Sequence, residues 1–238
     1  MDNLRKSFKS LKWYEWIMII VMIAIAGFSM IKAFIKPTTS SLPVWLTVVN
    51  FISALCGIIC IFFCAKASIS NFAFGIVNTV VYVIYLAYRH IYGTLCLEVF
   101  IYLPVNIVGW ILWAKHRDEK EREKTKAKKL NGLQNVLSVI GVAALTGVCY
   151  FFLNKVDGTT PLLDAFTVGI GITATFLQFF RLREQYVWWI IQDIIAVAMY
   201  IVAFDPVYLT KKSIYLIMAV IGLINWVQLQ KTRNVENK

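Results

Sequence analysis

Residues 44–65 read VWLTVVNFISALCGIICIFFCA, a stretch that contains no charged side chain. A helix needs about 20 mainly apolar residues to cross about 30 Å of hydrocarbon. Comparable stretches recur, so that 59% of the 238 residues are hydrophobic and 16% are charged, which is too apolar for an ordinary soluble domain. We therefore expect an all-α integral membrane protein with about eight transmembrane helices, at residues 16–35, 44–65, 71–88, 94–114, 133–153, 162–180, 186–204 and 213–229.

The basic residues indicate how these helices cross the membrane. The formal net charge is +11, and with both termini in the cytoplasm 18 of the 24 Lys and Arg fall on that side, as the positive-inside rule requires. We therefore attribute the excess of Lys and Arg to the orientation of the chain in the membrane and expect no nucleic-acid partner. The one charge-rich stretch, residues 115–130 (KHRDEKEREKTKAKKL), is interpreted as a solvated cytoplasmic loop, with a lipid-binding patch as the alternative.

An internal repeat divides the helices. Asn78 and Asp193 align at an offset of 115 residues, each followed seven residues later by a tyrosine, Tyr85 or Tyr200, and at nearly the same offset Trp110 matches Trp226. The pattern predicts one transmembrane domain over residues 1–238 with a 1+3+1+3 arrangement and two parallel three-helix repeats. Its parts are a leading helix (16–35), a first repeat (44–114), the basic loop (115–130), a linker helix (133–153) and a second repeat (162–229).

Polar and aromatic side chains share helix faces within the two repeats. Polar groups in hydrocarbon must face one another or a wet cavity. We therefore expect them to line a binding site, and the alternative is that they only join helices by hydrogen bonds. The candidates are Asn78, Tyr85, Glu98, Tyr102, Asn106, Gln178, Trp188, Trp189, Gln192, Asp193 and Tyr200.

The segment around Asp193 is the most distinctive of these. Trp189 precedes Asp193 by four residues and shares its helix face. A flat aromatic ligand could stack on Trp188 and Trp189 while Asp193 takes its polar edge or, in a cation, its charge. Other tryptophans near helix ends are interpreted as anchors at the membrane surface, namely Trp13, Trp16, Trp45 and Trp113.

Several catalytic and metal-binding motifs are absent from the sequence. It contains no GxxxxGK[ST], HExxH or GxSxG motif and only two histidines. Three of its five cysteines, Cys56, Cys60 and Cys64, are spaced along one helix face and favour packing over a disulfide or zinc site. We therefore expect no enzyme activity, no metal and no cofactor.

Two segments resemble the PnuC family of bacterial vitamin transporters. The first reads NFAFGIVNTVVY at residues 71–82, followed by Tyr92-Gly93 and EVFIYLPVNIVGWILW at 98–113. The second reads EQYVWWIIQD at 184–193, with Tyr200, and the family's last helix is matched by Tyr215, Gly222 and Trp226. The resemblance extends from the second predicted helix onward.

The resemblance implies a SWEET-like fold of two three-helix bundles joined by a linker helix, with the substrate held midway between them. It also implies import of nicotinamide riboside by facilitated diffusion across the bacterial plasma membrane, followed by trapping through a cytosolic kinase. Related carriers take thiamine, riboflavin or deoxynucleosides, so these remain alternative substrates. Relatives with parallel repeats suggest a homo-oligomer such as a trimer. Two other hypotheses stay open: proton-coupled transport through Asp193, and a non-transporting receptor or scaffold.

Overall fold

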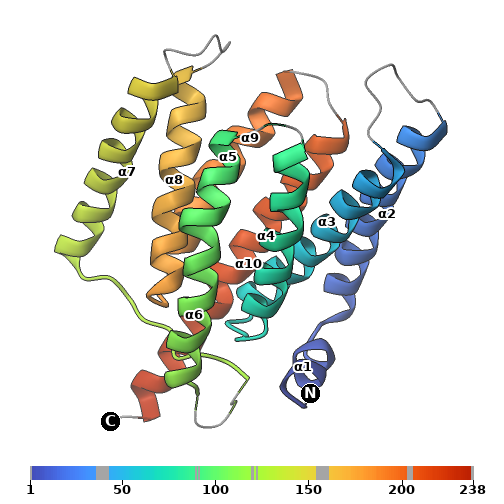
Figure 1. Cartoon of the computed structure of the whole chain (residues 1–238). Helices are drawn as coiled ribbons and strands as arrows, with labels where there is room; N and C mark the ends of the chain where they lie inside the picture. Colours follow the sequence, from blue (N-terminus) through green and yellow to red (C-terminus); the bar gives the residue numbers. More distant parts are fainter. Residues whose placement is uncertain are drawn as a thin grey trace. The chain divides into compact units, whose positions relative to one another are not determined.

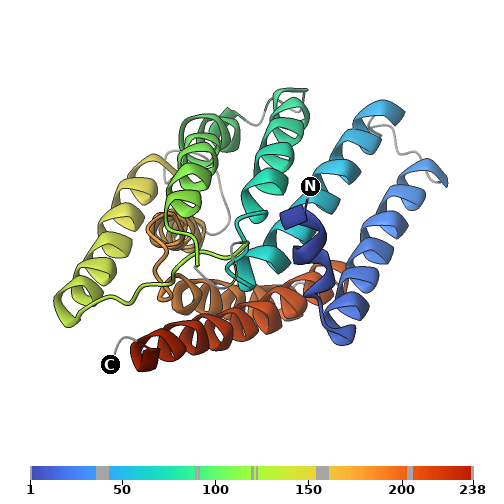
Figure 2. The ribbon, with the colours of Figure 1, turned by 90° about the horizontal axis from the view of Figure 1, so that it is seen from below.

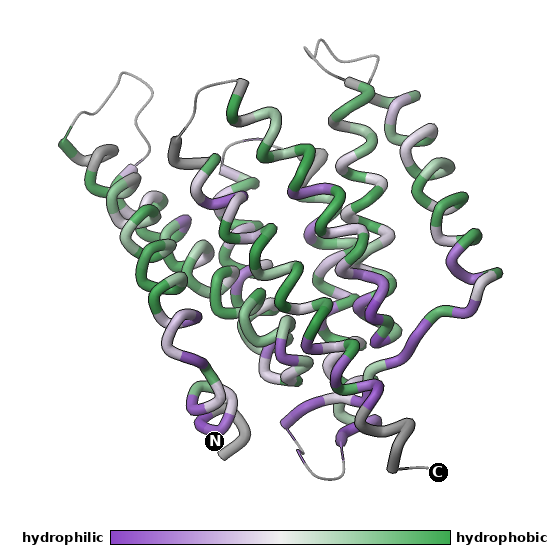
Figure 3. Tube along the Cα trace, turned by 180° about the vertical axis from the view of Figure 1, so that it is seen from behind, coloured by the Kyte–Doolittle hydropathy of each residue, from purple (hydrophilic) through white to green (hydrophobic). Residues whose placement is uncertain are grey.

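The computed structural model describes residues 2–35, 43–88, 90, 92–118, 121, 123–153, 161–202 and 206–236, a few of them by their backbone alone. Hydrophobic residues dominate the helices, whereas hydrophilic residues gather in the first helix and in the connection before α7 (Figure 3). The helices are α1 (Asp2–Lys9), α2 (Trp13–Ile35), α3 (Val44–Ala65), α4 (Asn71–Tyr88), α5 (Tyr92–Leu97), the π-helical turn η1 (Glu98–Tyr102), α6 (Leu103–Lys115), α7 (Gly132–Leu153), α8 (Pro161–Phe179), α9 (Gln185–Val202) and α10 (Pro206–Glu236) (Figure 1).

The helices agree with the apolar segments expected from the sequence. Within the described residues, five helical segments are long and apolar enough to cross a membrane, and three shorter apolar ones lie at Trp13–Phe28, Ala165–Phe179 and Gln185–Met199. The bounds of α3 and α4 are those expected from hydropathy. The all-α membrane fold is therefore confirmed, while the 1+3+1+3 arrangement stays a prediction.

The chain divides into two compact units, and the first comprises Met1–Thr125. Its most extensive packing joins α3 to α4, and α2 packs on α3 while α4 packs on α6. In Figure 2 the light-blue α3 runs beside the darker α2. A cluster of aromatic rings from Phe8, Phe63 and Phe74, with centroids 5.0 to 6.2 Å apart, joins α1 to the end of α3 and to α4.

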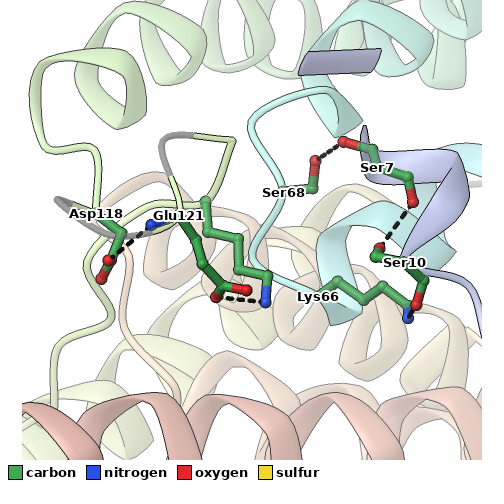
Figure 4. Close-up of polar contacts among 7 residues, drawn as sticks. Ser7, Ser10, Lys66, Ser68, Asp118 and Glu121 are labelled. Atoms are coloured by element: carbon green, nitrogen blue, oxygen red, sulfur yellow. Dashed lines mark hydrogen bonds and ion pairs between the residues drawn. The ribbon is translucent and has the colours of Figure 1, made fainter. Parts of the chain in front are cut away.

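Polar contacts fasten the N-terminal segment to the turn between α3 and α4 (Figure 4). The hydroxyls of Ser7 and Ser68 lie 2.8 Å apart in a buried hydrogen bond. Lys66 Nζ donates to the carbonyl of Ser10 and lies 2.7 Å from Glu15 Oε2, with side chains 9% and 1% exposed. Because removing one partner of a buried ion pair leaves an uncompensated charge, this pair ties α2 firmly to the first unit.

The second unit comprises Lys126–Lys238. Here α7 packs on α8, α8 on α9, and α9 on α10. Glycines permit two of these close approaches: a Cβ on Gly169 would lie 2.7 Å from Thr146 Oγ1, and one on Gly222 would lie 2.4 Å from the ring of Tyr186. The side chains of Trp226 and Tyr186 meet edge to face beside Gly222, with centroids 5.8 Å apart.

The close approach at Gly222 makes a testable prediction. Gly222→Ala should lower the thermal stability of the detergent-solubilised protein, because the new methyl group forces the Tyr186 ring aside, at a cost of about 1–3 kcal/mol. Gly147→Ala is the matched control, since nothing lies within 4 Å of a Cβ there and alanine favours a helix over glycine. Equal melting temperatures for the two variants would contradict the packing described.

The two units contain the same turn at an offset of 114 residues. In the first unit this turn follows α3, and in the second it follows α8. Each of these helices ends with a backbone hydrogen bond typical of helix C-termini: Ser68 N donates to Phe63 O in the first unit, and Leu182 N donates to Leu177 O in the second, both at 2.9 Å. The residue with a left-handed backbone is Ala67 (φ 55°) in the first unit and Arg181 (φ 63°) in the second. The correct offset is thus 114, not the predicted 115.

The offset falls to 113 beyond the π-helical turn η1. Trp113 packs edge to face on Phe72, with centroids 4.8 Å apart, as Trp226 packs on Tyr186. Phe72 and Tyr186 are 114 residues apart, but the two tryptophans are 113 apart. A π-helical turn contains one residue more than the α-helix that it interrupts, and η1 therefore accounts for the change.

Two predictions about tryptophans are consequently wrong. The counterpart of Trp226 is Trp113 and not Trp110, which is 41% exposed. Trp113 is also not a membrane-surface anchor, because its side chain is completely buried. Trp13, Trp16 and Trp45 are exposed, as anchors should be.

The basic loop at 115–130 is more ordered than a solvated connection. Thr125, Ala127 and Leu130 are buried. The carbonyls of Ala67 and Arg181 each accept a backbone hydrogen bond from the loop: Ala67 O from Thr125 N (2.9 Å), and Arg181 O from Lys128 N (2.8 Å). Leu130 N also donates to Glu184 Oε2 at 3.1 Å. The prediction of a fully solvated loop is therefore wrong for these residues, because pairing with the turns satisfies the loop's backbone.

Candidate functional site

Amide side chains of the first unit lie against small residues on neighbouring helices. Asn78 Oδ1 accepts a hydrogen bond of 2.8 Å from Ser53 Oγ on α3. A Cβ on Gly57 would lie 3.3 Å from the same oxygen, and one on Gly75 would lie 2.6 Å from Asn106 Oδ1. Glycine at position 75 thus gives α6 room to bring the Asn106 amide against α4.

Glu98 and two tyrosines complete the candidates of the first unit. Glu98 is the first residue of η1 and lies beside the Thr79 hydroxyl of α4. Tyr102 ends η1, and Tyr85 stacks on Tyr82 with planes 9° apart and centroids at 5.8 Å. π-helical turns occur frequently at functional sites because they redirect neighbouring side chains.

In the second unit, the polar residues of α9 contact the helices on both sides. Gln192 Nε2 donates to the carbonyl of Thr167 on α8 at 3.1 Å. Asp193 Oδ1 accepts from Lys212 Nζ of α10 at 3.1 Å, with side chains 6% and 24% exposed. Sequence reasoning missed Lys212 because it lies next to Lys211 near the end of an apolar segment, where a solvent-exposed lysine is expected.

The remaining candidates of the second unit are half-buried or outside the described side chains. Trp188, Trp189 and Gln178 are half-buried, and the Gln178 carbonyl accepts a hydrogen bond from Arg181 N. The side chain of Tyr200 lies outside the described residues. Trp188 and Trp189 thus lie on α9 together with Gln192 and Asp193.

The polar contacts of the two units occupy matched positions. Ser53 and Asn78 of the first unit correspond, 114 residues on, to Thr167 and Gln192, which are also joined. The neighbouring side chains of Thr79 and Glu98 likewise correspond to the ion pair of Asp193 and Lys212. The counterpart of Asn78 is thus Gln192, one residue before the predicted Asp193. A correct offset would have drawn attention to Lys212 as the counterpart of Glu98.

The two units differ in the size of the side chains at some matched positions. At an offset of 114, Trp189 takes the position of Gly75, and beyond η1 Ala219 takes the position of Asn106. The adjacent tryptophans are therefore particular to the second unit, whereas the amide packed on a glycine is particular to the first. Among the described residues, no group of three or more His, Cys, Asp or Glu side chains could hold a metal ion.

Two helical units that repeat the same polar contacts in an apolar, multi-pass chain are typical of secondary transporters built from internal repeats. Comparison with known proteins identifies the family. The nicotinamide mononucleotide transporter family model matches residues 47–228, and this chain belongs to that family. The resemblance to PnuC proteins is therefore confirmed.

Individual relatives extend the comparison to most of the chain. The nicotinamide riboside transporter PnuC of Neisseria mucosa is 34% identical over 190 residues, covering 76% of this chain and 72% of that protein. PnuC of Haemophilus influenzae is 28% identical over 219 residues, covering 90% and 92%. Among solved structures, a crystal structure of the vitamin B3 transporter PnuC has a TM-score of 0.73 and 28% identity and covers 98% of each chain.

Proposed function

We propose that this chain imports nicotinamide riboside across the bacterial plasma membrane by facilitated diffusion. The observation that carries the proposal is the match to PnuC proteins that are named as nicotinamide riboside or vitamin B3 transporters, over as much as 98% of the chain. The matched region includes every helix on which a candidate residue lies. The proposal adds that a cytosolic kinase phosphorylates the imported vitamin and so prevents its return, and that the chain itself is not an enzyme.

The proposed roles of the candidate residues follow from their chemistry. In the second unit, the indoles of Trp188 and Trp189 stack on the nicotinamide ring, while Gln178, Gln192 and Asp193 offer polar groups to ribose and carboxamide. In the first unit, Asn78, Asn106 and Tyr102 offer similar groups. Tyr85 and Tyr200 are proposed to close the site. The half-buried state of both indoles supports the stacking role.

The proposal also fixes a topology and an environment. Both termini lie in the cytoplasm, so that α1 and the basic loop at 115–130 are on the inner side, as their charge favours. A homo-oligomer such as a trimer is proposed from the resemblance to parallel-repeat carriers.

The deciding experiment is transport by the purified chain alone. Proteoliposomes that contain only this protein should equilibrate labelled nicotinamide riboside without ATP and without an ion gradient, and excess unlabelled nicotinamide riboside should compete. Thiamine, riboflavin and a deoxynucleoside serve as the alternative substrates. Saturable flux of thiamine alone would overturn the assignment of nicotinamide riboside as the substrate, but it would leave the assignment of facilitated diffusion in place. Accumulation that requires a pH gradient would overturn the uniport mechanism.

A further inference from the structure

A set of exposed basic side chains lies on α1 and immediately before α2. These four residues, which we call the α1 basic surface, are Arg5, Lys6, Lys9 and Lys12. Glu15 is the only acidic residue from position 5 to position 35. Its side chain is 1% exposed and lies 2.7 Å from Lys66 Nζ. Along residues 5–35, which the structure describes, no exposed acid therefore offsets the charge of the α1 basic surface.

The opposite face of α1 is fastened to the rest of the first unit. Phe8 packs edge to face on Phe63 and Phe74, with centroids 5.0 and 6.2 Å away. The Ser7 hydroxyl lies 2.8 Å from that of Ser68 in a buried hydrogen bond. Side chains at positions 5, 6 and 9 of a helix lie on the side away from positions 7 and 8. The docking of α1 therefore turns its basic side chains outward.

Aromatic contacts place α1 at the level of the lipid headgroups. The ring of Phe8 stacks on Trp16, with centroids 6.4 Å apart, and Trp16 is 42% exposed near the start of the apolar helix α2. Exposed tryptophans near the ends of membrane helices lie among the headgroups. Lys12 Nζ lies 5.7 Å from the centre of the Tyr14 ring, which meets Trp13 edge to face. Basic and aromatic side chains thus alternate where the chain enters the membrane.

We propose that the α1 basic surface binds the phosphate groups of anionic membrane lipids. A basic helix with aromatic residues beside it is typical of segments that lie on a membrane surface. Each Lys or Arg close to an anionic membrane strengthens binding by about fivefold. Since α1 is docked on the turn between α3 and α4, a lipid that binds the docked helix stabilises this end of the first unit. The inference goes beyond the proposed transport function and does not depend on the substrate.

The basic loop at 115–130 fits this role less well. Acidic residues are mixed with its basic ones, and Lys124 Nζ lies 2.6 Å from Glu121 Oε2. The loop backbone also pairs with the turn after α3, where Ile69 N donates to the carbonyl of Glu123 at 2.8 Å. Partial neutralisation and this pairing favour the α1 basic surface, rather than the loop, as the site of lipid binding.

The test is the melting temperature of the purified full-length chain in an uncharged detergent as lipid is added. Phosphatidylglycerol should raise it by about 2 °C or more in a saturable way, and the zwitterionic phosphatidylcholine should raise it much less. High salt should reduce the difference, because the charges are exposed. Inorganic phosphate at the same concentration should have no such effect. An equal rise with phosphate, or a phosphatidylglycerol effect that salt leaves unchanged, would overturn the proposal.

The decisive variant removes the charge of the α1 basic surface and leaves its docking contacts in place. It combines Arg5→Gln, Lys6→Gln, Lys9→Gln and Lys12→Gln. The phosphatidylglycerol concentration that gives half of the full rise should increase by about tenfold or more. If this variant does not fold, Lys6→Gln with Lys9→Gln tests the same surface and should increase that concentration by about fivefold or more.

The control lowers the net charge by the same amount in the basic loop. It combines four substitutions of exposed side chains, Lys115→Gln, Arg117→Gln, Lys128→Gln and Lys129→Gln. This variant should respond to phosphatidylglycerol as wild type does. An unchanged response in the α1 variant, or an equal loss in the loop variant, would overturn the assignment. A chain that responds to the lipid but does not carry nicotinamide riboside would overturn the proposed function alone.

Discussion

Replacing Trp189 with alanine should reduce nicotinamide riboside flux in proteoliposomes to the background of empty vesicles. The proposed indole supplies the flat surface on which the ring stacks, and central aromatic residues of this kind commonly contribute about 2 kcal/mol or more to binding. The first unit has Gly75 at the matched position, so the repeat offers no second indole there to take its place.

Trp110→Ala is the control for this experiment. Its side chain is 41% exposed, and its loss should leave flux near that of wild type. Thermal unfolding of both variants in detergent would show that each is folded before flux is compared. Normal flux through a well-folded Trp189→Ala protein would contradict the proposed stacking role of Trp189.

Trp113→Ala should destabilise the protein by about 3–5 kcal/mol, the usual cost of removing a tryptophan side chain from a packed core. Trp113 is completely buried and packs on Phe72, so its truncation leaves a cavity between α4 and α6. The measurement is the melting temperature or the midpoint of denaturant unfolding.

Trp110→Ala is again the matched variant, because it makes the same chemical change three residues earlier on the same helix. It should cost far less, since the Trp110 side chain is partly exposed. Similar destabilisation by the two changes would contradict the assignment of Trp113, rather than Trp110, as the counterpart of Trp226.

Hydrophobicity was sufficient to predict the apolar helices, but it predicted neither the hydrophilic α1 nor the register between the two units. The ends of α3 and α4 could be read directly because charged or polar residues interrupt long apolar runs. The offset between the units could not be read from the sequence, because similar residues such as Asn78 and Asp193 align well one position away from their structural counterparts. The π-helical turn at Glu98–Tyr102 could not be predicted either, since nothing in the sequence EVFIY distinguishes it from an α-helical segment.

The candidate site was predicted in part for the same reason. Asn78, Glu98, Gln192 and Asp193 were chosen as candidates because polar residues in apolar segments are conspicuous. Lys212 was missed because its position near a helix end favoured exposure, and the reach of a lysine side chain to Asp193 is a matter of tertiary structure. Helical periodicity places Trp113 on a face, but it cannot tell whether that face meets lipid or Phe72.

The π-helical turn also bears on how such a protein can change by mutation. The two units keep their contacts at an offset of 114 before η1 and 113 after it, so the stretch from Ala67 to Trp113 is one residue longer than the stretch from Arg181 to Trp226. Since the extra residue is confined to one wide turn, Glu98 at the start of that turn and Trp113 beyond it have partners at positions that match those of the partners of Lys212 and Trp226. A gene encoding two such halves can therefore gain or lose one amino acid within a helix without disrupting either half.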